Sequence, residues 1–136
     1  MMEDLTLVVK DPNELSNYTC FDVKLPSYLP EGFKFSKAEF FKEDKDDVVE
    51  NSKYIGLYFT NEKTGKHIYM QQRLAEKETA YATGADKVEE IKINGADAIF
   101  YGGTNLDWEA NGVIYMLSGR GLVTKGEMIK MAESIK

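Results

Sequence analysis

Apolar and polar residues alternate with a period of two along much of the chain, which is typical of β-strands buried on one side. This alternation predicts three strands in the first half, at residues 33–41, 54–60 and 67–72. The mostly charged and polar stretch between the first two strands predicts a solvated loop. Residues 18–23 are either a further strand or an extended strap. Pro26 and Pro30 follow them, and each proline favours extended backbone at the residue before it.

Two Asn-Gly pairs in the second half mark tight hairpins. Asn94-Gly95 joins residues 88–93 to 96–101, and Asn111-Gly112 joins residues 106–110 to 113–118. Asn and Gly readily take the left-handed backbone conformations of a two-residue type I′ turn, so these pairs predict four antiparallel strands. Before them, residues 75–83 fit a short polar helix, although this pattern is weak.

The chain closes with an amphipathic helix, predicted over residues 124–135. Thr124 and Glu127 have the spacing of a capping box, in which each side chain binds the other residue's backbone N–H. One apolar stripe follows at helical spacing, formed by Met128, Ile129, Met131, Ala132 and Ile135. This stripe must be buried, and the sheet offers the only large surface for it.

These elements predict one α+β domain over residues 1–136: a single curved antiparallel sheet of five to seven strands, with the C-terminal helix packed on one face. Residues 1–25 are expected to form an N-terminal strap or extra strand, and residues 26–136 the core of the fold. The predicted core consists of Phe33, Phe35, Leu57, Phe59, Ile68, Met70, Phe100, Trp108, Met128, Ile129, Ala132 and Ile135.

Charge and hydropathy exclude two classes of partner. The 17 basic and 23 acidic residues give a net charge of −6, without the basic patch that a phosphate backbone requires, so we expect no nucleic-acid partner. No apolar stretch approaches the roughly 20 residues that span a bilayer, so this segment is not expected to insert into a membrane.

Tyrosines lie opposite the apolar side of several predicted strands. Cross-strand packing on a partly solvated face explains them without any function. The alternative is an aromatic platform for a ligand or protein partner, since exposed aromatic patches can mark interaction sites. The candidate interaction face consists of Tyr54, Tyr58, Tyr69 and Tyr101.

No pattern predicts catalysis. His67 is the only histidine and has no nucleophile motif to accompany it, and Cys20 is expected to be a buried small residue. One Cys and one His cannot make a structural zinc site, and the acidic run at residues 43–50 lacks the EF-hand spacing. The strand carboxylates, among them Glu90 and Asp107, cannot be paired from spacing alone. We therefore predict no catalytic, cofactor-binding or metal-binding residues, no cofactor and no enzyme.

The order of several short motifs resembles a known family. The motifs are the opening Leu29-Pro30-Glu31-Gly32-Phe33, the hairpin Ile93-Asn94-Gly95, the hairpin with Trp108, Gly112 and Tyr115, and the helix with Glu127, Ala132, Ser134 and Ile135. Over roughly residues 26–136 the chain is similar to the family of domain of unknown function 4367, found in Gram-positive bacteria. This resemblance implies an extracytoplasmic module that commonly follows a membrane anchor, and it carries no catalytic residues.

Two functions follow as expectations. The first is a non-enzymatic extracytoplasmic or cell-surface sensor or protein-interaction module with an unknown partner. The second rests on fold analogy to lipoprotein carriers: a domain that binds a small apolar ligand between helix and sheet. The start of the chain, Met1-Met2-Glu3-Asp4, has neither the basic nor the apolar region of a signal peptide.

Overall fold

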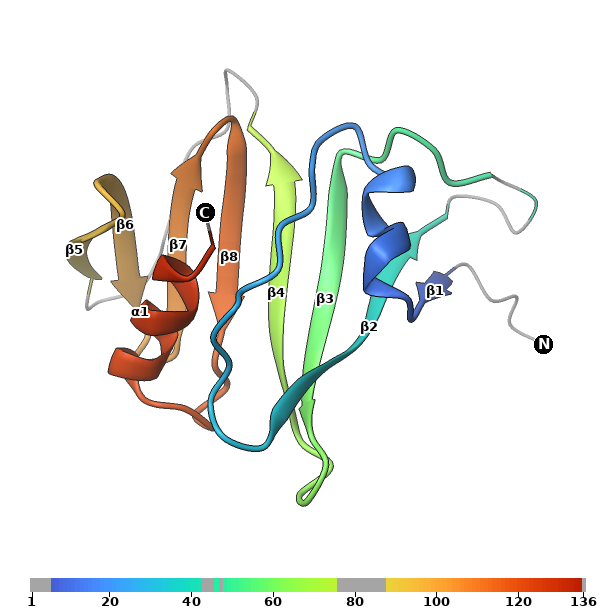
Figure 1. The fold of residues 1–136 in the computed structure, drawn as a ribbon. Helices are drawn as coiled ribbons and strands as arrows, with labels where there is room; N and C mark the ends of the chain where they lie inside the picture. Colours follow the sequence, from blue (N-terminus) through green and yellow to red (C-terminus); the bar gives the residue numbers. More distant parts are fainter. Residues whose placement is uncertain (1–5, 43–45, 47, 76–87, 136) are drawn as a thin grey trace.

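A computed structural model describes residues 6–42, 46, 48–75 and 88–135 (Figure 1). Its main element is one antiparallel sheet of eight strands in the order β1-β2-β3-β4-β8-β7-β6-β5. The strands are β1 (Thr6–Val9), β2 (Phe33–Phe41), β3 (Tyr54–Asn61), β4 (His67–Leu74), β5 (Val88–Ile93), β6 (Ala96–Tyr101), β7 (Asn105–Ala110) and β8 (Val113–Ser118). A 3₁₀ helix, η1 (Pro12–Asn17), and an α-helix, α1 (Lys125–Glu133), complete the fold.

The sheet consists of two four-stranded meanders joined by the pairing of β4 with β8. The α+β class is as predicted, but the sheet has eight strands rather than five to seven. The eighth strand is β1, a run of only four residues within the N-terminal segment 1–25, and it pairs with β2 from Thr6↔Phe41 to Val9↔Ala38. A run of four residues shows almost no alternation in the sequence, so only its pairing with β2 identifies it as a strand.

The local turn and capping signals are confirmed. Asn94 and Asn111 have φ of 51° and 54°, and the following glycines are also positive, as a type I′ turn requires. Thr124 caps α1, and both reciprocal hydrogen bonds of the capping box with Glu127 are present. The weak helical pattern at residues 75–83 falls almost entirely outside the described residues.

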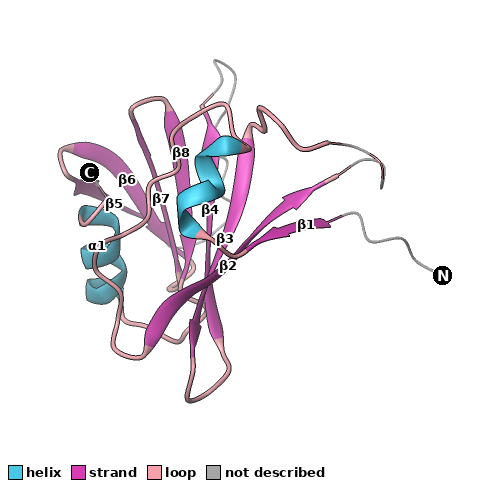
Figure 2. Cartoon of the chain, turned by 45° about the vertical axis from the view of Figure 1, so that its right-hand side comes forward, coloured by secondary structure: helices cyan, strands magenta, loops and turns pink. Residues whose placement is uncertain are grey.

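One face of the sheet, here called the inner face, is covered by three elements. Figures 1 and 2 show η1, α1 and the connecting segment on the same side of the sheet. The connecting segment is residues 18–32, here called the strap, which runs from η1 to β2. Of residues 18–23, only Thr19 makes a strand-like bridge, to Ser52, so the extended strap is the correct alternative.

The core lies between the inner face and this covering layer. Leu57, Phe59, Ile68 and Met70 of the central strands are 0–1% exposed, and α1 buries Met128, Met131 and Ala132 against the sheet. Every predicted core residue is buried except two that are half-buried, Phe35 and Ile129. Phe35 lies at a β-bulge, where the register of β2 on β3 shifts.

A buried polar side chain attaches the strap to the sheet. Gln72 occupies an inner-face position of β4 and is 0% exposed. Its Oε1 accepts a hydrogen bond from the Lys24 backbone N–H at 3.2 Å, and its Nε2 donates to the Lys24 carbonyl at 2.6 Å. The carboxamide thus pairs with the strap as a neighbouring strand would, which fixes the path of the strap over β4.

Candidate functional site

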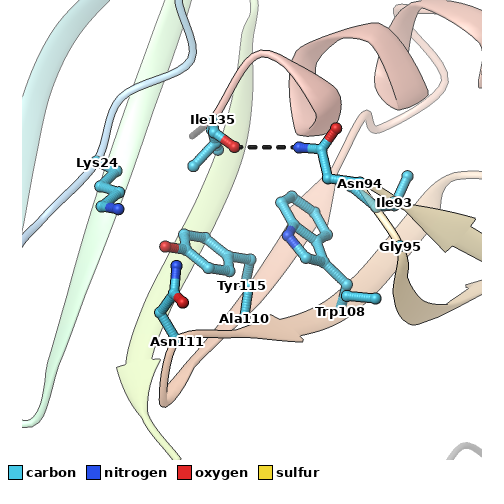
Figure 3. A pocket seen from close by; sticks show the side chains of 10 residues that line it. Lys24, Ile93, Asn94, Gly95, Trp108, Ala110, Asn111, Tyr115 and Ile135 are labelled. Atoms are coloured by element: carbon cyan, nitrogen blue, oxygen red, sulfur yellow. Dashed lines mark hydrogen bonds between the residues drawn. The ribbon is translucent and has the colours of Figure 1, made fainter.

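A cleft of about 570 Å³ opens on the inner face where four segments meet (Figure 3). Lys24 comes from the strap, Asn94 from the β5–β6 turn, Asn111 from the β7–β8 turn, and Ile135 from the end of α1. The volume is within the usual range of small-molecule sites. The remaining lining residues are Ile93, Gly95, Ala96, Trp108, Ala110 and Tyr115.

Two stacked aromatic rings contribute to the lining. Trp108 of β7 and Tyr115 of β8 are directly opposite in the sheet register. Their ring centroids are 5.0 Å apart with an interplanar angle of 10°. Each residue is only 2% exposed, so the rings are part of the core and only a small part of each reaches the cleft.

The polar atoms of this pair are unused within the protein. Neither the Trp108 indole N–H nor the Tyr115 hydroxyl has a hydrogen-bond partner among the described residues, and neither atom is sealed from the surface. Burial raises the pKa of Tyr115, so its hydroxyl keeps its proton at neutral pH. Since both atoms reach the surface, water or a ligand can supply the acceptor that the protein does not.

The walls of the cleft are held in place by polar contacts. The Asn94 side-chain amide donates to the Glu133 carbonyl at 3.1 Å and to the Ile135 carbonyl at 3.3 Å, which ties the β5–β6 turn to the end of α1. The Gln72 carboxamide holds the Lys24 backbone on the opposite side. Hydrogen bonds of Asn94 and Gln72 therefore hold together the elements that surround the cleft.

The outer face of the sheet carries the four tyrosines predicted as an interaction face. Tyr54, Tyr58 and Tyr69 gather on β3 and β4, and we call them the tyrosine strip. The Tyr58 and Tyr69 centroids are 5.0 Å apart, and the Tyr69 ring lies over Gly56, where a Cβ atom would be 2.7 Å from its hydroxyl. Glycine in β3 thus makes room for an aromatic ring from β4.

Tyr101 does not join the tyrosine strip. The register places it in the same transverse row as Tyr69, but Ser118 of β8 and Asn105 of β7 lie between them. Three strand spacings of about 4.8 Å separate the two tyrosines by about 14 Å. Tyr101 instead donates a hydrogen bond to Asp107 at 3.1 Å. Its pKa is raised to about 12 by burial and by the negative charge of Asp107.

Charged residues surround the tyrosine strip. Burial and the neighbouring Glu39 carboxylate raise the pKa of Tyr58 to about 12. The Lys37 ammonium lies 5.0 Å above the Tyr58 ring and 3.3 Å from Glu39. Since both charges are paired with each other, the strip presents mainly aromatic surface.

The residues considered for catalysis have structural partners. His67 packs its ring edge-on against Tyr58, with centroids 5.0 Å apart, and its Nε2 accepts from the Arg120 guanidinium at 2.7 Å. Cys20 is exposed, so the expectation of a buried small residue was wrong: it lies on the strap, where the sheet does not cover it. Within the described ranges, no group of three or more His, Cys, Asp or Glu is placed to hold a metal ion.

Asp107 is the carboxylate with the most unusual environment. It is 6% exposed on the outer face, and burial raises its pKa, while the hydrogen bond from Tyr101 acts in the opposite direction. Glu90 and Asp107 line the same pocket of about 530 Å³, but Ile99 of β6 lies between the two in the register. The two carboxyl groups are thus on strands that are not neighbours.

The pairing of Trp108 with Tyr115 can be predicted from the sequence alone. The Asn111-Gly112 turn fixes the hairpin register, and counting back from it places Trp108 opposite Tyr115. No local signal places Lys24 beside this pair, because its position depends on a hydrogen bond to Gln72, 48 residues away.

Comparison with known proteins gives one family. The sequence matches the family described as domain of unknown function (DUF4367) over residues 23–135, which is most of the chain. No curated protein and no solved structure matches significantly. Within the described part of the chain, none of the helices has the length and hydrophobicity needed to cross a bilayer. The chain therefore belongs to the family of domain of unknown function (DUF4367).

Proposed function

We propose that this domain is a non-enzymatic, extracytoplasmic binding module that holds a small ligand in the cleft between the end of α1, the strap and the sheet. The observation that carries the proposal is the Trp108–Tyr115 pair: two buried rings that line the cleft and whose polar atoms have no partner among the described residues. Apolar lining with a few convergent polar groups is typical of ligand sites.

The cleft supports a ligand at the end of α1. Met128 and Met131, farther back on the helix, are 1% and 0% exposed and pack on the sheet. Ile135, beyond the last turn, instead lines the cleft together with Ala96 and Ala110. The place for an apolar group is therefore at the helix end, where packing leaves space.

The test uses Trp108, which is the only tryptophan in the chain and so an intrinsic reporter of the cleft. The uncharged dye N-phenyl-1-naphthylamine should accept excitation energy from Trp108 when it binds. Ala110→Phe fills the cleft and should abolish this transfer. Glu109→Phe, a neighbouring exposed position, is the matched control and should leave it intact. Equal transfer in both variants would contradict binding in the cleft, and so would a wild type that transfers energy neither to this dye nor to its anionic analogue 8-anilinonaphthalene-1-sulfonate.

A non-enzymatic role is supported by the surroundings of the candidate groups. His67 is engaged by Arg120, and Asp107 by Tyr101. General acid–base chemistry needs such a group within reach of a bound substrate, and neither residue lines the cleft.

The extracytoplasmic location rests on the family resemblance alone. The full-length gene tests it: a secretion signal or membrane anchor encoded before this domain would support the proposal. A gene with neither would contradict it.

A second candidate function is recognition of a protein by the tyrosine strip. It is favoured by the tyrosines of β3 and β4, of which Tyr58 and Tyr69 have ring centroids 5.0 Å apart, on the face that α1 and the strap leave uncovered. A photo-crosslinking amino acid at position 58 should then capture a partner in the native organism. The same amino acid at exposed position 14 on η1 should not, and equal capture at both positions would refute this candidate.

A further inference from the structure

The described lining of the cleft has a consistent chemical character: it offers hydrogen-bond donors and carries no acidic side chain. The Trp108 indole N–H and the Lys24 ammonium can only donate, and the Tyr115 hydroxyl and Asn111 amide can donate as well as accept. Among the described residues that line the cleft, none is Asp or Glu, although the chain carries 23 of them and a net charge of −6.

Lys24 is the charged group of the cleft. Its ammonium has no ion-pair partner among the residues that the structure describes. The two hydrogen bonds from Gln72 fix its backbone, so the side chain starts from a defined point beside the aromatic pair. Figure 3 shows the Lys24 amine and the Tyr115 hydroxyl turned toward each other across the cleft.

An occupant must match these donors as well as the apolar lining. A cation would meet no carboxylate among the described lining residues. A purely apolar molecule would cut the indole N–H and the hydroxyl off from water without giving them an acceptor, which is unfavourable. An anionic group satisfies all the donors at once, and charge-assisted hydrogen bonds are stronger than neutral ones.

We infer that the ligand of this cleft is a small organic anion, with a carboxylate, sulfonate or phosphate group bound by Lys24, Trp108 and Tyr115 and an apolar body against Ile93, Ala96, Ala110 and Ile135. This inference rests on the proposed function, since it names the chemistry of the same site. It is also more specific, because the carrier hypothesis requires only an apolar ligand.

Two dyes that differ by a single sulfonate test the inference. N-Phenyl-1-naphthylamine is neutral, and 8-anilinonaphthalene-1-sulfonate adds one anionic group to the same ring system. The measured quantity is the ratio of the dissociation constant of the neutral dye to that of the sulfonate, each obtained from energy transfer from Trp108 in the full chain. Comparing this ratio between variants cancels the difference in hydrophobicity between the dyes, because that difference is the same for each variant.

Lys24→Gln should lower this ratio by about tenfold, because it removes the charge and leaves the side-chain length similar. Tyr115→Phe should lower it by a smaller factor. Lys10→Gln is the matched control: Lys10 is exposed next to β1, so the same loss of charge there should leave the ratio unchanged. Added salt should lower the wild-type ratio as well.

The outcomes separate the two proposals. If the neutral dye binds the cleft and Lys24→Gln and Lys10→Gln have the same ratio as the wild type, the anion inference is overturned and the cleft remains a binding site. If neither dye takes energy from Trp108, both proposals fail. Retained binding of the neutral dye by Lys24→Gln shows that the variant is folded.

Discussion

Replacing Gln72 by Leu tests whether one buried carboxamide holds the strap on the sheet. The substitution removes two hydrogen bonds, from the Lys24 N–H and to the Lys24 carbonyl, at 3.2 and 2.6 Å. Each bond contributes about 1 kcal/mol, and the two backbone groups of Lys24 lose a partner while partly buried. Leu fills much of the same space, so the apolar packing is largely kept. We expect the free energy of unfolding to fall by about 2–3 kcal/mol.

Urea unfolding followed by circular dichroism measures this loss. With a slope of about 1.5–2 kcal/mol per molar for a domain of this size, the midpoint should fall by roughly 1–2 M. Gln71→Leu is the matched control, because Gln71 is the neighbouring residue on the outer face and is half-buried. Its effect should be within about 0.5 kcal/mol. Equal midpoints for the two variants would refute the role assigned to Gln72.

Gln72→Glu should make the free energy of unfolding depend on pH, in a direction that the structure predicts. Burial raises the pKa of a carboxyl group above its unfolded value, and only the protonated form can donate to the Lys24 carbonyl. The variant should therefore be nearly as stable as the wild type below the unfolded pKa and lose stability as the pH rises through the raised one. A difference from the wild type that does not change with pH would contradict this explanation.

Three further predictions follow from other parts of the structure. Asn94→Gly keeps the positive φ of its turn but loses the hydrogen bonds to the end of α1. It should therefore lower the free energy of unfolding in urea by about 1 kcal/mol more than Asn111→Gly, whose side chain has no such bond among the described residues. Equal losses in the two variants would show that the bonds to α1 add no stability. Trp108→Ala should cost about 3–5 kcal/mol by the same measurement, because the ring is 2% exposed, and a loss below about 1 kcal/mol would remove the ring from the core. Tyr58 and Tyr101 should ionise near pH 12 in an absorbance titration of the phenol groups. Because their pKa values are raised from 10, the stability that they contribute is complete below pH 10 and is lost as the pH rises through about 12. Tyr58→Phe and Tyr101→Phe variants that leave the absorbance change near pH 12 unaltered would contradict this assignment.

The sequence predicted the parts of the fold that depend on neighbouring residues. The Asn94-Gly95 and Asn111-Gly112 turns and the Thr124 cap are set by backbone preferences within a few positions, so they can be recognised without a tertiary structure. Alternation likewise assigns the two faces of β3 and β4, but not of β2, where the bulge between Phe35 and Lys37 shifts the register.

Features that depend on distant partners were not predicted. The pairing of β4 with β8 decides that Tyr69 and Tyr101 lie apart, and nothing near either tyrosine encodes that order. The position of Lys24 depends likewise on Gln72. One signal was present: Gln72 follows Ile68 and Met70 on the inner face, and a polar residue in such a series indicates a specific buried contact.

The first strand has a practical consequence for producing the domain. The family match begins at residue 23, whereas β1 and η1 precede it and contribute buried Val9 and Leu15. Expression from residue 23 would free the backbone groups of β2 that β1 now pairs and would uncover Phe40, which lies 5.4 Å from Tyr18 between ring centroids. An open strand edge beside apolar surface is a template for intermolecular pairing. Such a fragment should self-associate, so expression should start no later than Thr6.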